Sequence, residues 1–306
     1  MAIIKPVIKT MPDGSLGAVL PYHVSFEGLE KAIICRDDED CDVMVKCVFV
    51  CARRKNVLVI TYGVVSNHAH LAILARSFWD AMAFAQELKR MYSQLFQKKC
   101  SESKVLRHTD VCVLLLDTDW YLRNALAYII RNAFDNGAIN LTDYKWTGFR
   151  ACFRDKSQPI EGIPVSKMTT REWRNHFHTG DSLASVPWVL NSQYELEPAS
   201  ACEIDYLESA FAKDEAFFYK SVGIVNVAEM TQKLVINPRQ SLTDAVFFKE
   251  MESISQRWYS TCVSSLSITQ KARLIPYVYH IMKTNVNQLS RGFGLSREEV
   301  SRLLNL

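Results

Sequence analysis

Two histidines, His68 and His70, offer the first chemistry in this chain. They lie in an apolar run over residues 68–74, which follows a second apolar run over residues 57–62. Side chains at i and i+2 of a strand point to the same face of a sheet, so the two imidazoles would project side by side. Two imidazoles on one rigid face supply half of a divalent-metal site. The alternative is two ordinary polar residues on a half-exposed strand.

Tyr128 and Asn132 offer the second chemistry. They are four residues apart, on one face of a helix that we expect to begin at residues 117–119 and to end at residues 136–137. A tyrosine oxygen can attack phosphorus and form a covalent phosphotyrosine link. The Asn132 amide oxygen can complete a metal site that two histidines begin, and the metal would polarise the phosphoryl oxygen. The alternative is a buried tyrosine with a satisfied hydroxyl and an asparagine near a helix end.

The elements that must position these residues follow the order β-α-β-β-α-β and then α. We expect residues 1–19 to be irregular. Strands are predicted at 22–26, 57–63, 68–74 and 111–116, and the first two helices at 37–54 and 77–95. The strand at 111–116 is expected to be buried. This is the split βαβ, or ferredoxin-like, order. Such an antiparallel sheet with helices on one face leaves its other face free. The fold class is therefore α+β, with an all-helical C-terminal domain after the sheet.

We expect three parts in the chain: a domain over 1–155, a connection over 156–200 with a helix start at 169–173, and a helical domain over 201–306. Near residues 285–305 a short helix, a glycine turn and a second helix form a helix-turn-helix pattern. Ser296 and Glu299 have the spacing of a capping box. Arg297 and Arg302 are its basic exposed positions and are candidate DNA contacts. The alternative is a purely structural helical hairpin.

Composition limits the classes of protein. The chain of 306 residues is 48% hydrophobic and 23% charged, which is typical of a folded soluble protein, and its net charge of +3 does not by itself indicate a nucleic-acid partner. We find no apolar run of the ~18 residues that a membrane span needs, and no signal-peptide core. The nine cysteines lack CxxC spacing. We therefore expect free thiols, a cytoplasmic location and no membrane partner.

A local basic strip follows the second predicted helix. It contains six basic residues and only two acidic ones, Glu87 and Glu102, in a chain whose positive and negative charges are nearly equal overall. The six basic residues are Lys89, Arg90, Lys98, Lys99, Lys104 and Arg107. Such a strip can track a phosphate backbone. The alternative is a solvated helix face. Trp146, Phe149 and Arg150 can stack on bases or belong to the core, and we assign no role to His23 and His108.

The chain resembles the single-tyrosine transposases of the HUH (His-hydrophobic-His) nuclease superfamily, and among them the REP-associated tyrosine transposases and their insertion-sequence relatives. Residues 65–71 read Val-Ser-Asn-His-Ala-His-Leu where the family has Met-Pro-Asn-His-Val-His-Leu. The other similar blocks occur in the family's order over about residues 20–155; they are residues 22–26, 36–40, 95–97, 128–137 and 144–150.

The resemblance implies roles for four residues. His68 and His70 would be metal ligands, Asn132 the third ligand and Tyr128 the nucleophile. The family cuts single-stranded DNA, leaves a 5′-phosphotyrosine and a free 3′ hydroxyl, and rejoins the strand elsewhere without a nucleotide cofactor. The resemblance also implies Mg²⁺ or Mn²⁺ as the ion and DNA hairpins as the substrate. The donor set alone suits several ions.

Departures from the family pattern leave alternatives open. Ala69, Val65-Ser66 and Ala133 replace the usual residues, but none of these changes removes a catalytic group. They indicate a diverged member, which leaves open a domesticated, catalytically silent DNA-binding regulator that acts through the helix-turn-helix. A replication initiator or relaxase is disfavoured because no second tyrosine lies three or four residues from Tyr128. Relatives include dimers that exchange the tyrosine helix, so monomer and homodimer both remain possible.

Overall fold

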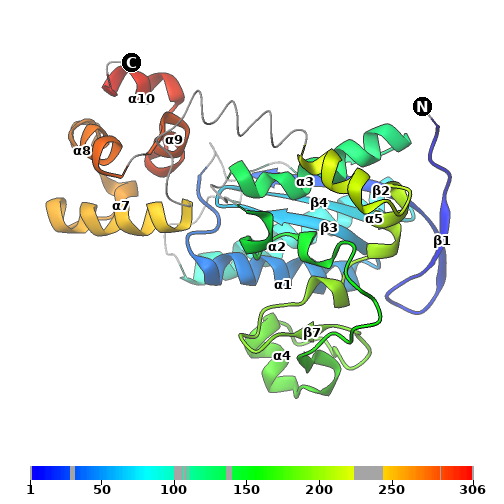
Figure 1. Cartoon of the computed structure of the whole chain (residues 1–306). Coiled ribbons are helices and arrows are strands. Elements are labelled where there is room, and N and C mark those ends of the chain that lie inside the picture. Colours follow the sequence, from blue (N-terminus) through cyan, green and yellow to red (C-terminus); the bar gives the residue numbers. More distant parts are fainter. Residues whose placement is uncertain are drawn as a thin grey trace.

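The structure is a computed structural model that describes residues 2–27, 32–99, 106, 109, 111–135, 140–223, 244–282 and 284–304. An antiparallel sheet packs between helices (Figure 1), which confirms the predicted α+β class. The predicted order β-α-β-β-α-β is present from β2 to β5; its elements are β2 (Leu16–Glu27), α1 (Asp38–Arg54), β3 (Leu58–Val64), β4 (His68–Ala75), α2 (Phe78–Lys99) and β5 (Val111–Leu115).

The sheet has the strand order β3-β4-β2-β5, and each neighbouring pair is antiparallel. β3 and β4 form a hairpin, in which Val65 N donates to the His68 carbonyl at 3.0 Å. His70 lies opposite Gly63 of β3 on one side and opposite Ser25 of β2 on the other. The central strand β4 therefore carries both histidines between two neighbours.

Two predictions about the strands are wrong. Residues 1–19 are not irregular throughout, because β1 (Val7–Thr10) pairs with residues 16–19 of β2 around a turn in which Gly14 has a φ of 83°. Its side chains alternate between exposed and half-buried, so it lacks the apolar run that predicts a strand. β5 is not buried: Cys112, Leu114 and Leu115 are exposed, since β5 pairs with β2 alone among the described strands.

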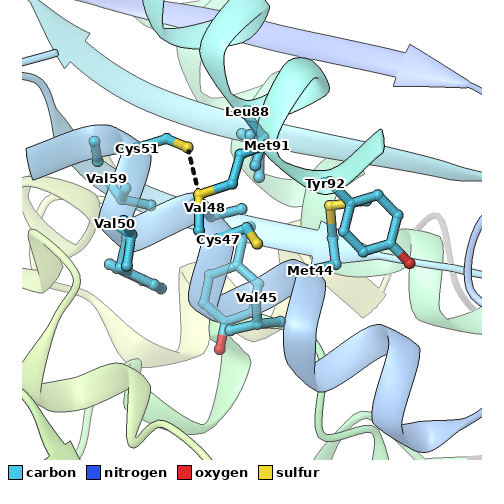
Figure 2. Packing of buried hydrophobic residues seen from close by; sticks show 14 of the residues in the cluster. Met44, Val45, Cys47, Val48, Val50, Cys51, Val59, Leu88, Met91 and Tyr92 are labelled. Atoms are coloured by element: carbon cyan, nitrogen blue, oxygen red, sulfur yellow. Dashed lines mark hydrogen bonds between the residues drawn. The ribbon is translucent and has the colours of Figure 1, made fainter. Parts of the chain in front are cut away.

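Alternate side chains of each strand point to opposite faces of the sheet, and helices cover both faces. On one face, Leu71 and Ile73 pack in the cluster that contains α1 and α2. Figure 2 shows side chains of α1 and α2 in this cluster, including the contact in which Cys51 Sγ donates to Met91 Sδ at 3.6 Å. On the other face, Ala72 and Leu74 pack in a second cluster with α3 (Asp119–Asp135) and α5 (Ile204–Ala210). The expectation of a free face is therefore wrong.

The segment expected as a connection is folded against the sheet domain. It contains α4 (Thr170–Phe177), which begins at the predicted residue with a capping box between Thr169 and Glu172. Trp173, Phe177 and Trp188 belong to the same core cluster as α1. Short elements complete this region; they are β6 (Ile163–Pro164), β7 (Val189–Leu190), and the 3₁₀ turns Val165–Lys167 and Pro198–Ser200. Two further 3₁₀ turns, Leu141–Asp143 and Gly148–Ala151, lie between α3 and this segment.

The C-terminal helices form their own core at one end of the molecule (Figure 1). They are α7 (Asp244–Tyr259), α8 (Ile268–Ile281), α9 (Val286–Phe293) and α10 (Arg297–Leu304), with a 3₁₀ turn at Val263–Ser265. Gly294 ends α9 in the left-handed conformation, and Glu299 N donates to Ser296 Oγ at 3.2 Å. The predicted turn and capping box are confirmed. Across the described ranges, no helix is both long and apolar enough to span a membrane.

Candidate active site

Helix α3 lies directly on β3, the neighbour of the strand that carries His68 and His70, because Gly63 of β3 has no side chain. A Cβ atom at this position would lie 2.3 Å from the Ile129 carbonyl oxygen, so only glycine permits this approach. Ile129 and Ile130 are fully buried against the sheet face that also holds Ile60. The sequence spacing then brings Tyr128 and Asn132 to the same side of the helix, above β4.

The four residues singled out in the sequence meet at one place. Asn132 Oδ1 lies 3.3 Å from His68 Nε2, and the Tyr128 hydroxyl lies 3.4 Å from His70 Nε2. The His68 and His70 rings are 4.9 Å apart between centres. Asn132 is 1% exposed, whereas Tyr128 is 37% exposed. The amide is therefore a fixed part of the interior, and the tyrosine is accessible to a large substrate.

Hydrogen bonds orient the amide and the first imidazole. Asn132 Nδ2 donates to the Tyr128 carbonyl at 3.2 Å, which directs its oxygen toward His68. His68 Nδ1 lies 2.8 Å from Asn67 Oδ1, an oxygen that can only accept. A neutral ring has one such proton, and the shorter of its two contacts with amide oxygens favours Nδ1 as its place, which leaves the lone pair at Nε2. As a result, two acceptor atoms, His68 Nε2 and Asn132 Oδ1, face each other.

This donor set fits a divalent cation. Ligands at right angles around an ion with metal–ligand bonds of about 2.1 Å are about 3 Å apart, which is close to the 3.3 Å between His68 Nε2 and Asn132 Oδ1. His70 would supply the third donor through Nε2. Within the described ranges, no group of three or more His, Cys, Asp or Glu side chains could hold a metal ion. The candidate set of His68, His70 and Asn132 is not such a group, because its third donor is an amide oxygen.

Burial keeps the imidazoles of His70 and His23 neutral. It lowers the pKa of His70 to about 2, with smaller contributions from His68 and His23 nearby. Burial also lowers the pKa of His23 to about 4. The neutral imidazole is the form that binds a metal ion. At neutral pH these rings therefore offer lone pairs instead of positive charges.

Arg131 places a positive charge beside the tyrosine. Its Cζ atom lies 5.5 Å from the centre of the Tyr128 ring. A guanidinium in this position makes a cation–π contact with the ring and can bind a phosphate group. The sequence analysis quoted this residue within the similar block and gave it no role.

The predicted basic strip lies away from these residues. It belongs to α2, which packs on the opposite face of the sheet from α3. Lys89 donates to the Thr109 carbonyl, Arg90 pairs with Glu87 at 2.7 Å, and Lys99 contacts three carboxylates at the start of α1. Lys98 lies in the last turn of α2. Lys104 and Arg107 lie outside the described residues, so a DNA contact by this strip stays a prediction.

The other candidate DNA contacts lie partly on the surface of α10 and partly in the core. Arg297 and Arg302 are exposed on α10. Phe149 packs against Phe218, with ring centres 6.2 Å apart, and Trp146 packs at the edge of the two core clusters. The aromatic rings therefore contribute to the core.

Arg150, the third residue of that group, is half-buried, and its Nε is a buried atom without a hydrogen-bond partner. A contact of Arg150 with a base stays a prediction.

The C-terminal helices contact the loop that precedes the histidines. Ser66 Oγ donates to Asp244 Oδ2 at 3.0 Å, and Arg291 donates to the same carboxylate at 2.8 and 2.9 Å. Gln288 also donates to Asp244, which is fully buried. This network joins α7 and α9 to the β3–β4 loop, next to Asn67.

His23 is the residue that the sequence analysis missed. Its Nε2 lies 3.0 Å from His70 Nδ1, on the side of the ring away from Tyr128. His23 lies in β2, two residues from Ser25, which pairs with His70. Only this long-range register reveals the neighbourhood. His108, the other histidine without an assigned role, lies outside the described residues.

Comparisons with known proteins give no match: no protein-family model fits the chain, and no curated protein is significantly similar to it. The functional argument therefore depends on the geometry of the site.

Proposed function

We propose that this chain is a metal-dependent nuclease and strand-transferase for single-stranded DNA, of the single-tyrosine HUH type. The observation that carries the proposal is the facing pair of acceptor atoms, His68 Nε2 and Asn132 Oδ1, beside an accessible tyrosine. Two further observations support it. The strand order β5-β2-β4-β3 is compatible with the ferredoxin-like arrangement, and α3 lies over the histidines.

His68, His70 and Asn132 would hold the ion. A bound Mg²⁺ or Mn²⁺ would polarise the scissile phosphate and stabilise negative charge in the transition state. Asn67 fixes the His68 ring, and the hydrogen bond to the Tyr128 carbonyl fixes the Asn132 amide. The site is thus organised before substrate binds.

Tyr128 supplies the nucleophile. Its hydroxyl gives up its proton to water, because the lone pair of His70 Nε2, 3.4 Å away, would hold the ion, and Arg131 lies beside the resulting phenolate. The phenolate oxygen forms a bond to phosphorus while the bond from phosphorus to the 3′ oxygen breaks. The 3′ oxygen takes up a proton and leaves as a hydroxyl. Attack of a 3′ hydroxyl on the phosphotyrosine reverses these steps and rejoins a strand, so no nucleotide triphosphate is consumed.

The tyrosine would act within its own chain, because α3 packs on the sheet of the same chain. The substrate we propose is single-stranded DNA beside a hairpin. This part of the proposal comes from the resemblance of the sequence, and the exposed fraction of Tyr128 is compatible with it.

A second candidate function is a DNA-binding regulator without cleavage. The observation that favours it is the helix-turn-helix geometry of α9 and α10, with Arg297 and Arg302 exposed. A regulator has no physical need for a nucleophile, three donors and an orienting Asn67 in one place. We therefore place the nuclease first.

The test is incubation with labelled single-stranded hairpin DNA from the flanks of the gene, with Mn²⁺ or Mg²⁺, followed by a denaturing gel. We expect a protein–DNA adduct in the wild type that is absent in Tyr128→Phe. Tyr121→Phe, on the same helix, is the matched control and should form the adduct. Tight binding without an adduct in either ion would reject the nuclease in favour of the regulator.

A further inference from the structure

His23 occupies a fixed place beside the candidate ligand His70. β2 and β4 are neighbouring antiparallel strands in which Ser25 pairs with His70 and His23 pairs with Ala72. Residues two apart on a strand share a face, so His23 is the diagonal neighbour of His70 on that face. The backbone ladder thus sets the separation of the two rings.

The two rings meet through nitrogen atoms. His23 Nε2 and His70 Nδ1 are 3.0 Å apart, whereas the ring centres are 5.1 Å apart and the planes differ by only 24°. If the two rings were stacked face to face, the distance between these nitrogens would be close to the distance between the ring centres. The geometry is that of a hydrogen bond with a single proton between two imidazole nitrogens.

The contact on the other side of the His70 ring, with the Tyr128 hydroxyl, can form with either tautomer, so the role proposed for Nε2 decides between them. If His23 donated, neutral His70 would carry its own proton on Nε2, which could then neither bind a metal ion nor accept from a hydroxyl. If His70 donates from Nδ1, its Nε2 lone pair faces the Tyr128 hydroxyl at 3.4 Å. Only the second arrangement lets Nε2 act as an acceptor.

We infer that His23 is a positioning residue, which accepts the Nδ1 proton of His70 and so holds the His70 Nε2 lone pair toward the candidate metal site and Tyr128. His68 follows the same scheme with Asn67 Oδ1 as its acceptor. Metal-ligating histidines in general donate their other N–H to such a partner. The choice of this tautomer and its consequence for metal binding both rest on the proposed function.

The first measurement is the tautomer of His70, from two-bond couplings in ¹H–¹⁵N NMR spectra of the metal-free full chain. We expect protonation at Nδ1 in the wild type and in His23→Gln, because the glutamine oxygen can accept at the same position. We expect His23→Phe, which has no acceptor, to show a mixture with Nε2 protonated. A wild-type His70 protonated at Nε2 would overturn the inference, whether or not any variant folds.

The second measurement is the affinity for Mn²⁺, from water proton relaxation. We expect His23→Phe to weaken binding by about 10–100-fold and His23→Gln to restore most of it. His176→Phe, a histidine that stacks on Tyr194 away from the site, is the control for loss of an imidazole. Equal affinities of His23→Phe and wild type would overturn the inference. Wild-type protein that binds no Mn²⁺, with the expected tautomers, would instead reject the proposed metal site alone.

Discussion

Gly63→Ala tests whether the close approach of α3 to the sheet builds the site. The new Cβ would lie 2.3 Å from the Ile129 carbonyl oxygen, and such contacts are essentially never shorter than 3.0 Å, so the helix must retreat by at least about 0.7 Å. The two atoms nearest to the new Cβ, the carbonyl oxygen and carbon of Ile129, belong to the backbone and cannot rotate away as a side chain can. We expect a loss of about 1–3 kcal/mol in the free energy of unfolding, as for other overpacked sites.

The retreat also moves the residue next to Ile129, which is Tyr128, away from His70. Displacements near 1 Å in a catalytic constellation cost up to about a hundredfold in rate, so we expect Gly63→Ala to form the DNA adduct about 10–100-fold more slowly. Chemical denaturation and the gel assay measure the two effects. Gly180→Ala, which has open space around the new Cβ, should match the wild type in both. A Gly63→Ala protein with unchanged stability and adduct rate would refute the reasoning.

The remaining predictions concern other parts of the chain. An equimolar mixture of Tyr128→Phe and His68→Ala should form no adduct, since each chain uses its own tyrosine; restored activity would show exchange of helices between chains. Asp244→Ala should destabilise the C-terminal helices by about 3–5 kcal/mol in denaturation curves, because it removes the buried carboxylate that pairs with Arg291 and accepts from Gln288, and an unchanged curve would contradict this. Iodoacetamide at pH 8 should modify exposed Cys112 before Cys51, whose pKa burial raises to about 12; mass spectrometry that finds the reverse order would contradict the burial.

The sequence predicts the local features of the site well. The spacing of His68 and His70 on a strand, and of Tyr128 and Asn132 on a helix, follows from the periods of these elements. The capping box at Ser296 is equally local. Such patterns depend on a few neighbouring residues, so they do not require knowledge of the fold.

Long-range features escape prediction for a physical reason. The contact between His23 and His70 depends on the register of β2 against β4, and the place of α3 depends on the missing side chain of Gly63. A count of basic residues gives the charge of α2 and not the face of the sheet on which it packs. β1 was missed because it is only four residues long, half-exposed, and has just two apolar residues in succession.

The most direct test of the central claim is to identify the residue that carries DNA. The adduct formed with Mn²⁺ would be digested with nuclease and protease, and the peptides analysed by mass spectrometry. The account predicts a nucleotide attached through its 5′ phosphate to the peptide of Tyr128, at that oxygen. Attachment at another residue, or no modified peptide with either ion, would contradict it.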